Sequence, residues 1–243
     1  MLVRDRFKAD GERLFRWRSY SPLILLVVVV SQLVWGGRPD FARHLAWDIL
    51  CFGIALSGQA IRLVVAGAIP AGSSGRNTRY QIADSLNTTG AYSLVRHPLY
   101  LGNFLIWVGL TLIAANAQLS VLVILVFWLV HERIMYAEEE FLRAQFGELY
   151  RDWAARTPAF VPRWIGYRPA RLGFSIRAAI RREYSSAIAL VTVFVLFRWV
   201  AVYPETAAWP PGEPRLTLLV VASVYVALSA VKRRTDWLDV EGR

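Results

Sequence analysis

Six long apolar runs determine what this chain can fold into. They cover residues 20–36, 46–69, 99–115, 118–136, 184–203 and 215–231. A helix needs about 20 predominantly apolar residues to cross the roughly 30 Å hydrocarbon core of a bilayer, and shorter runs reach that length through their flanks or through tilt. The pattern therefore predicts an all-α integral membrane protein with about six transmembrane helices.

The basic residues are distributed unevenly between the segments that connect these runs. Twenty-three of the 28 Lys and Arg lie in residues 1–20, 70–98, 132–183 and 232–243. The remaining loops carry only Arg38, Arg43 and Arg215. Because basic residues gather on the cytoplasmic side of a membrane, we expect both termini and the two long basic segments in the cytoplasm of a bacterium, with the helices in its inner membrane.

The net charge of +10 has the same explanation. Topology and attraction to anionic lipid account for it, so we expect no nucleic-acid partner. A metal site is not expected either. Cys51 is the single cysteine and lies inside an apolar run, and the histidines His44, His97 and His131 are far apart in the sequence.

Two polar clusters flank the third and fourth apolar runs. Arg96 and His97 stand just before the third run, and Glu138 and Glu139 follow the fourth. The two runs are joined by a short turn near "ANAQ", so we expect a tight antiparallel hairpin that brings the clusters together. The pairing is either a structural ion pair that closes the hairpin or a functional site, since polar residues near membrane depth are often functional.

An amphipathic cytoplasmic helix is predicted directly after these glutamates. Leu142, Phe146, Leu149 and Trp153 recur at helical spacing and would form one apolar stripe. In the second apolar run, Gly53 and Ser57 show the small-residue spacing that lets membrane helices approach closely.

The two polar blocks resemble the paired motif of the isoprenylcysteine carboxyl methyltransferase and phospholipid methyltransferase superfamily. "GAYSLVRHPLYLG" and "EEEFLRAQFGELYRDW" carry the resemblance, which covers about residues 46–162. The matching residues are Gly90, Tyr92, Arg96, His97, Pro98, Tyr100, Gly102, Glu138, Glu139, Leu142, Phe146, Gly147 and Tyr150.

The resemblance implies S-adenosyl-L-methionine as the cofactor, bound on the cytoplasmic side by both blocks. Arg96 and His97 would hold its carboxylate or ribose, and Glu138 and Glu139 would hold its ammonium group or balance its sulfonium. Pro98 and Gly102 would shape the start of the helix, and the tyrosines Tyr92, Tyr100 and Tyr150 would wall the pocket. Such a cofactor carries both signs of charge, which suits a site that contains both.

The resemblance also suggests how the chain is organised. We expect a basic N-terminal segment (1–19), a first transmembrane hairpin (20–69), a methyltransferase core (70–162), a basic connector (163–183), an additional C-terminal hairpin (184–231) and a cytoplasmic tail (232–243).

The implied acceptor is a lipid or lipidated group that enters from the bilayer. We expect Arg62 to be catalytic together with Glu138 and Glu139, because Arg62 and Gln59 offer a cation and a donor to an anionic carboxylate or phosphate. A phospholipid amine N-methyltransferase is the nearest alternative. An NADPH-dependent sterol-type reductase and a non-catalytic membrane subunit or transporter are the others.

Overall fold

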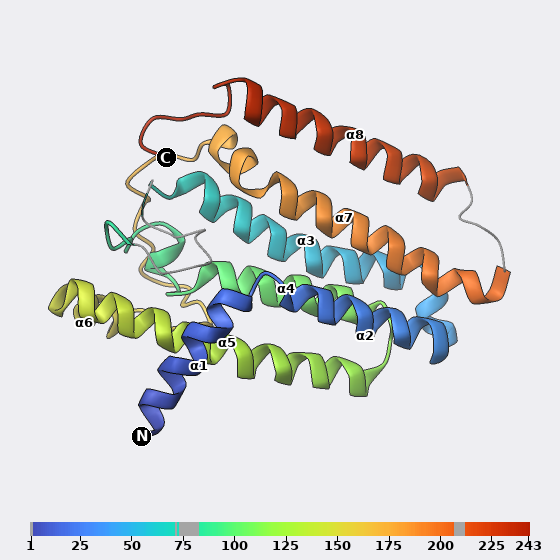
Figure 1. The fold of residues 1–243 in the computed structure, drawn as a ribbon, viewed down its shortest axis with the longest axis horizontal. Helices are drawn as coiled ribbons and strands as arrows, with labels where there is room; N and C mark the ends of the chain where they lie inside the picture. Colours follow the sequence, from blue (N-terminus) through green and yellow to red (C-terminus); the bar gives the residue numbers. More distant parts are fainter. Residues whose placement is uncertain (1, 71, 73–82, 207–211) are drawn as a thin grey trace.

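The computed structural model describes residues 2–70, 72, 83–206 and 212–243, and these residues are helical or irregular, without a named strand. Most of the helices lie side by side along one direction, and both chain ends lie at the end of the bundle that carries the short helix α6 (Figure 1). The helices are α1 (Val3–Trp17), α2 (Ser21–Trp35), η1 (Asp40–Arg43), α3 (Leu45–Ala68), η2 (Ala91–Ser93), α4 (Pro98–Leu112), α5 (Ala117–Phe146), α6 (Glu148–Ala154), α7 (Ile176–Thr206) and α8 (Gly212–Arg234).

Four helices are long and apolar enough to cross a membrane: α3, α5, α7 and α8. This confirms an all-α integral membrane protein for the described residues. Helices α2 and α4 have 15 residues each. At 1.5 Å per residue they measure about 22 Å, which is less than the hydrocarbon core needs. The expected total of six spans therefore remains a prediction.

Helices α3 and α4 approach each other through glycines. A side chain at Gly58 would collide with the carbonyl of Gly102, and one at Gly109 would lie 2.5 Å from the carbonyl of Cys51. The prediction that Gly53 and Ser57 mark the close approach is wrong, because both are exposed and no atom lies near a side chain built at Gly53. Gly58 is five residues along from Gly53, about 140° around the helix, and faces α4 instead.

The predicted hairpin of the third and fourth runs is confirmed. Helix α4 ends at Leu112, and α5 begins at Ala117 with the Asn116 side chain accepting a hydrogen bond from the Leu119 N–H at 2.9 Å. Such a cap satisfies one of the free N–H groups at the start of the helix. Helix α5 then continues for 30 residues and carries the glutamates at its far end.

The predicted amphipathic helix is divided between α5 and α6, and Leu149 does not belong to its apolar stripe. Helix α5 stops at Phe146, and Gly147 adopts a φ of +54° before α6 begins. This positive φ redirects the chain, so that Leu149 is 63% exposed. Tyr150 takes its place and is buried with Trp153.

Helix α1 packs across α5. Phe7 lies edge to face with Tyr136, and the Arg133 guanidinium lies 4.8 Å from the centre of the Phe7 ring. Gly11 allows the approach, because any side chain there would collide with the Arg133 carbonyl. The basic N-terminal segment thus forms a helix whose end, at the buried Phe15, reaches the polar end of the α4–α5 hairpin.

Candidate functional site

The two polar clusters meet as the sequence predicts. Arg96 donates to Glu139 at 3.0 Å, and the Nε2 atom of His97 lies 2.9 Å from the other oxygen of Glu139. The Nδ1 atom of His97 is 3.6 Å from Glu138, to which the Tyr100 hydroxyl donates at 2.8 Å. Each glutamate keeps a quarter of its side chain exposed. The cluster is therefore a network of both charge signs and not a fully closed ion pair.

Backbone hydrogen bonds from a distant segment fix the first cluster. The N–H groups of Arg96 and His97 donate to the carbonyls of Pro158 and Ala159, at 2.8 and 3.1 Å. The segment that follows α6 therefore lies against the start of α4. This contact fixes the backbone from which the Arg96 and His97 side chains reach the glutamates.

The turn before this cluster is held in the same way. Gly90 has a φ of +60°, and its N–H donates to the Arg168 carbonyl at 2.8 Å. The Arg168 N–H donates to the Ser93 hydroxyl at 2.9 Å. The Trp153 indole donates to the Tyr92 carbonyl at 3.0 Å, which joins α6 to the turn.

A cavity of about 980 Å³ extends from this network into the helical bundle. Its polar end contains Arg96, His97, Glu138, Glu139 and the tyrosines Tyr92, Tyr100 and Tyr150. Its apolar walls come from α2, α4 and α7 and include Leu25, Leu26, Ile106, Leu110, Leu190, Val193 and Phe197. The volume lies at the upper end of the usual range for small-molecule sites, so the cavity has room for two reactants.

An aromatic group lines the cavity beside the polar end. The His131 ring stacks on Phe127 at 3.7 Å and meets Tyr100 edge to face at 5.3 Å. The Nδ1 atom of His131 lies 2.9 Å from the Phe127 carbonyl. His131 is therefore held in one orientation by its own helix, and Trp107 meets its ring edge to face at 6.1 Å.

Two of the tyrosines lie outside the candidate spans and are held in their neutral form. Burial, reinforced by the Glu138 carboxylate, raises the pKa of Tyr92 above its usual value. Burial and the nearby Glu139 carboxylate likewise raise the pKa of Tyr150. Both hydroxyls therefore keep their protons at neutral pH and are available as hydrogen-bond donors.

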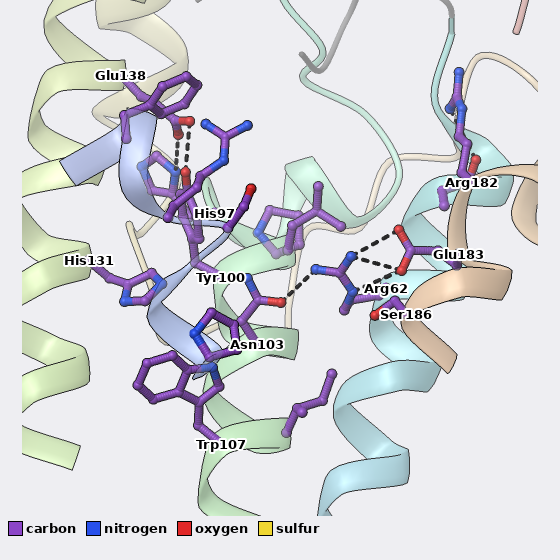
Figure 2. A pocket seen from close by; sticks show the side chains of 18 of the residues that line it. Arg62, His97, Tyr100, Asn103, Trp107, His131, Glu138, Arg182, Glu183 and Ser186 are labelled. Atoms are coloured by element: carbon purple, nitrogen blue, oxygen red, sulfur yellow. Dashed lines mark hydrogen bonds and ion pairs between the residues drawn. The ribbon is translucent and has the colours of Figure 1, made fainter. Parts of the chain in front are cut away.

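A second polar cluster lines the cavity deeper in the bundle (Figure 2). Arg62 on α3 donates to both oxygens of Glu183 on α7, at 2.9 and 3.1 Å, and to the Asn103 amide oxygen on α4 at 2.5 Å. Gln59 donates to Glu183 at 3.4 Å, and Ser186 donates to Gln59 at 3.1 Å. The charge of Arg62 is thus balanced inside the protein.

The structure places the predicted site residues in two groups. Arg62, Tyr92, Arg96, His97, Pro98, Tyr100, Glu138 and Glu139 all line the cavity. Gly102 does not: a side chain there would lie 2.7 Å from the Cγ atom of Arg62. This glycine makes room for Arg62 and has no place on the cavity wall.

Sequence reasoning missed Asn103 and Glu183. Asn103 interrupts an otherwise apolar run, which was a usable signal. Glu183 closes a charged stretch at the head of α7 and pairs with a residue 121 positions earlier, a separation that no local pattern reveals. Among the described residues, no group of three or more His, Cys, Asp or Glu is placed to hold a metal ion.

Comparison with known proteins gives a family match and several similar chains. Residues 49–149 match the family described as phospholipid methyltransferase. The chain is 33% identical over 152 residues to the nickel-cobalt-cadmium resistance protein NccN of Alcaligenes xylosoxydans xylosoxydans, which covers 63% of the chain and 65% of NccN. It is 32% identical over 152 residues to the cobalt-zinc-cadmium resistance protein CzcN of Cupriavidus metallidurans, which covers 63% of the chain and 64% of CzcN.

A plant enzyme is matched over a larger share of its own length. The chain is 33% identical over 151 residues to protein-S-isoprenylcysteine O-methyltransferase B of Arabidopsis thaliana, which covers 59% of the chain and 73% of that enzyme. The match spans slightly less than two thirds of the two resistance proteins. No solved structure matches the chain.

Proposed function

Because this chain belongs to the isoprenylcysteine carboxyl methyltransferase and phospholipid methyltransferase superfamily, we propose that it is a membrane methyltransferase that uses S-adenosyl-L-methionine. Its acceptor would be a lipid or lipidated group that reaches the cavity from the bilayer. The observation that carries the proposal is one cavity that joins the paired polar network to apolar walls formed by membrane helices.

The residues of the polar end suit this cofactor. S-adenosyl-L-methionine carries a carboxylate, an ammonium group and a sulfonium, and the network offers Arg96 as a cation and Glu138 and Glu139 as anions. We assign the cofactor carboxylate or ribose to Arg96 and His97, and the ammonium group to the two glutamates. The neutral hydroxyls of Tyr92 and Tyr150 provide further donors at the same end.

The bound cofactor would supply an electrophilic methyl group, and the protein would hold the cofactor and the acceptor in line for the transfer. Holding two reactants in line is worth up to about 7–11 kcal/mol of the activation barrier. The cavity extends from the motif network to the walls of α2 and α7, so the acceptor tail would lie among apolar side chains while its head group faces the cofactor end.

We propose an anionic acceptor, a carboxylate or a lipid phosphate. Such a nucleophile is already ionised at neutral pH, whereas an amine must first lose a proton to a base. Glu183 balances the charge of Arg62, so Arg62 does not attract an anion by charge alone. A phospholipid amine is the alternative acceptor, and the experiment below separates the two.

The orientation follows from the charge distribution. We propose that both termini, the cofactor end of the cavity and α6 face the cytoplasm of a bacterial inner membrane. The chain ends and α6 lie at one end of the bundle (Figure 1), and most of the basic residues lie in the segments at that end. Helices α2 and α4 would complete six spans with help from their flanks.

The test uses purified protein, methyl-labelled cofactor and separate vesicles that contain phosphatidic acid, phosphatidylethanolamine or a farnesylated cysteine. The proposal expects label in a carboxylate or phosphate acceptor. Label that appears solely in phosphatidylethanolamine would refute the anionic acceptor and leave the methyltransferase proposal standing. No transfer to any lipid, with no cofactor binding, would refute both.

A further inference from the structure

The face of α4 that lines the cavity carries one amide side chain. Tyr100, Asn103, Trp107 and Leu110 are spaced three or four residues apart and all line the cavity, as expected for one face of a helix. Tyr100 belongs to the motif network, and Leu110 belongs to the apolar core. Asn103 therefore lies at the boundary between the proposed cofactor end and the apolar end.

The orientation of the Asn103 amide is fixed by its partner. Arg62 donates to the Asn103 oxygen at 2.5 Å, and an arginine can only donate. The amide oxygen must therefore face Arg62, and the NH2 group must point to the other side. Figure 2 shows Asn103 between Arg62 and Tyr100, so this group is directed toward the motif network.

Arg62 is itself held in place from another helix. Two of its nitrogens donate to the two oxygens of Glu183, so the planar guanidinium has one orientation. Gln59 and Ser186 extend the chain of hydrogen bonds behind it, at 3.4 and 3.1 Å. Within the described part of the chain, no residue accepts a hydrogen bond from the Asn103 amide nitrogen, which is open to the cavity.

We propose that Glu183 and Arg62 form a positioning relay that turns the Asn103 NH2 group toward the methyl acceptor, and that Asn103 selects an oxygen nucleophile over an amine. A carboxylate or phosphate oxygen accepts a hydrogen bond from this group and keeps further lone pairs for the attack on the methyl group. An ammonium group has only donors to offer, and the deprotonated amine needs its single lone pair for the attack. This inference rests on the proposed function and names the residues that set its acceptor.

Glu183, the first residue of the relay, comes from outside the part of the chain that matches the family. It lies on α7, outside the residues 49–149 that match the family. The selectivity element of the cavity is thus completed by α7, which begins after the residues that match the family.

The decisive variant is Asn103→Asp, which keeps the shape and the acceptor for Arg62 but replaces the NH2 group by a carboxylate oxygen. We expect the KM for farnesylated cysteine or for phosphatidic acid to rise about tenfold or more. Equilibrium binding of labelled farnesylated cysteine to the cofactor-free protein falls by the same factor. The rate of methyl transfer to phosphatidylethanolamine rises relative to the rates for farnesylated cysteine and phosphatidic acid. The Kd for S-adenosylhomocysteine stays within about twofold of the wild-type value.

Two further variants separate positioning from mere packing. Asn103→Ser replaces the amide NH2 donor by a hydroxyl donor and is expected to retain more acceptor binding than Asn103→Asp. Glu183→Gln keeps the size of the side chain, releases Arg62 from its charge partner, and is expected to raise the acceptor KM with kcat nearly unchanged. If Asn103→Asp does not fold in detergent, the Asn103→Ser and Glu183→Gln measurements carry the test.

Unchanged acceptor KM and unchanged lipid selectivity in all folded variants would overturn the relay. This result would leave the proposed function intact as long as S-adenosylhomocysteine still binds. Wild-type protein that binds phosphatidylethanolamine in preference to both oxyanion probes would also overturn it. A wild-type protein that does not bind S-adenosylhomocysteine would instead refute the proposed function.

Discussion

The carboxylate of Glu183 on α7 holds the guanidinium of Arg62 on α3 through both of its oxygens, at 2.9 and 3.1 Å. The Arg62 and Glu183 side chains are only 18% and 4% exposed, so both charges are largely buried. This pair joins α7 to α3. It therefore has consequences for stability as well as for the acceptor.

Replacing one partner of this pair should destabilise the fold strongly. Glu183→Ala leaves Arg62 buried without its anion, and we expect a loss of about 3–5 kcal/mol in the free energy of unfolding. The double variant Arg62→Met with Glu183→Leu removes both charges and should recover most of that loss. Unfolding in detergent, followed by circular dichroism, measures both. A double variant no more stable than Glu183→Ala would contradict the pairing.

The close approach of α3 and α4 offers a matched pair of substitutions on one helix. Gly58→Ala places a methyl group against the Gly102 carbonyl and should cost about 1–3 kcal/mol. Gly53→Ala adds the same methyl group where no atom lies within 4 Å, and should be neutral or stabilise by up to about 1 kcal/mol. The same unfolding measurement compares them. Equal effects at both positions would refute the observed helix register.

The proposed orientation can be tested with introduced cysteines, because the single native cysteine, Cys51, is fully buried. Ala155 directly follows α6, and Asp40 begins η1 between α2 and α3, at the opposite end of the bundle; both positions are exposed. In intact cells, a membrane-impermeant thiol reagent should label Asp40→Cys and leave Ala155→Cys unlabelled. The reverse pattern would place the proposed cofactor end outside the cell and contradict the assignment.

The sequence predicted the parts of the site that depend on local order. Arg96, His97, Glu138 and Glu139 flank two runs joined by a short turn, so their meeting followed from the hairpin alone. Gly147 ended the predicted stripe at Phe146, because its positive φ redirects the chain. The spacing of the apolar residues gives no sign of this change of direction. Leu149 was therefore misplaced, and Tyr150 was buried instead.

The parts that depend on long-range packing could not be predicted. The contact of Glu183 with Arg62 joins residues 121 apart in the sequence. The hydrogen bonds from Arg96 and His97 to the segment after α6 are formed between backbone groups. Backbone groups are the same in every residue, so the sequence gives no sign of which carbonyl receives them. Only the packed structure reveals that α7 lines the cavity.

The most direct test of the central claim is a calorimetric titration of the purified protein in detergent with S-adenosylhomocysteine, followed by NADPH. The wild type should bind S-adenosylhomocysteine with saturation at one site and should not bind NADPH. Glu139→Ala and His97→Ala should abolish this binding while the protein stays folded, because both side chains belong to the network at the polar end. Glu140→Ala is the control, because the Glu140 carboxylate pairs with Arg143 at 3.4 Å, away from the network, and its removal should leave the Kd unchanged. A folded Glu139→Ala variant with the wild-type Kd, or a wild type that binds NADPH instead, would contradict the account.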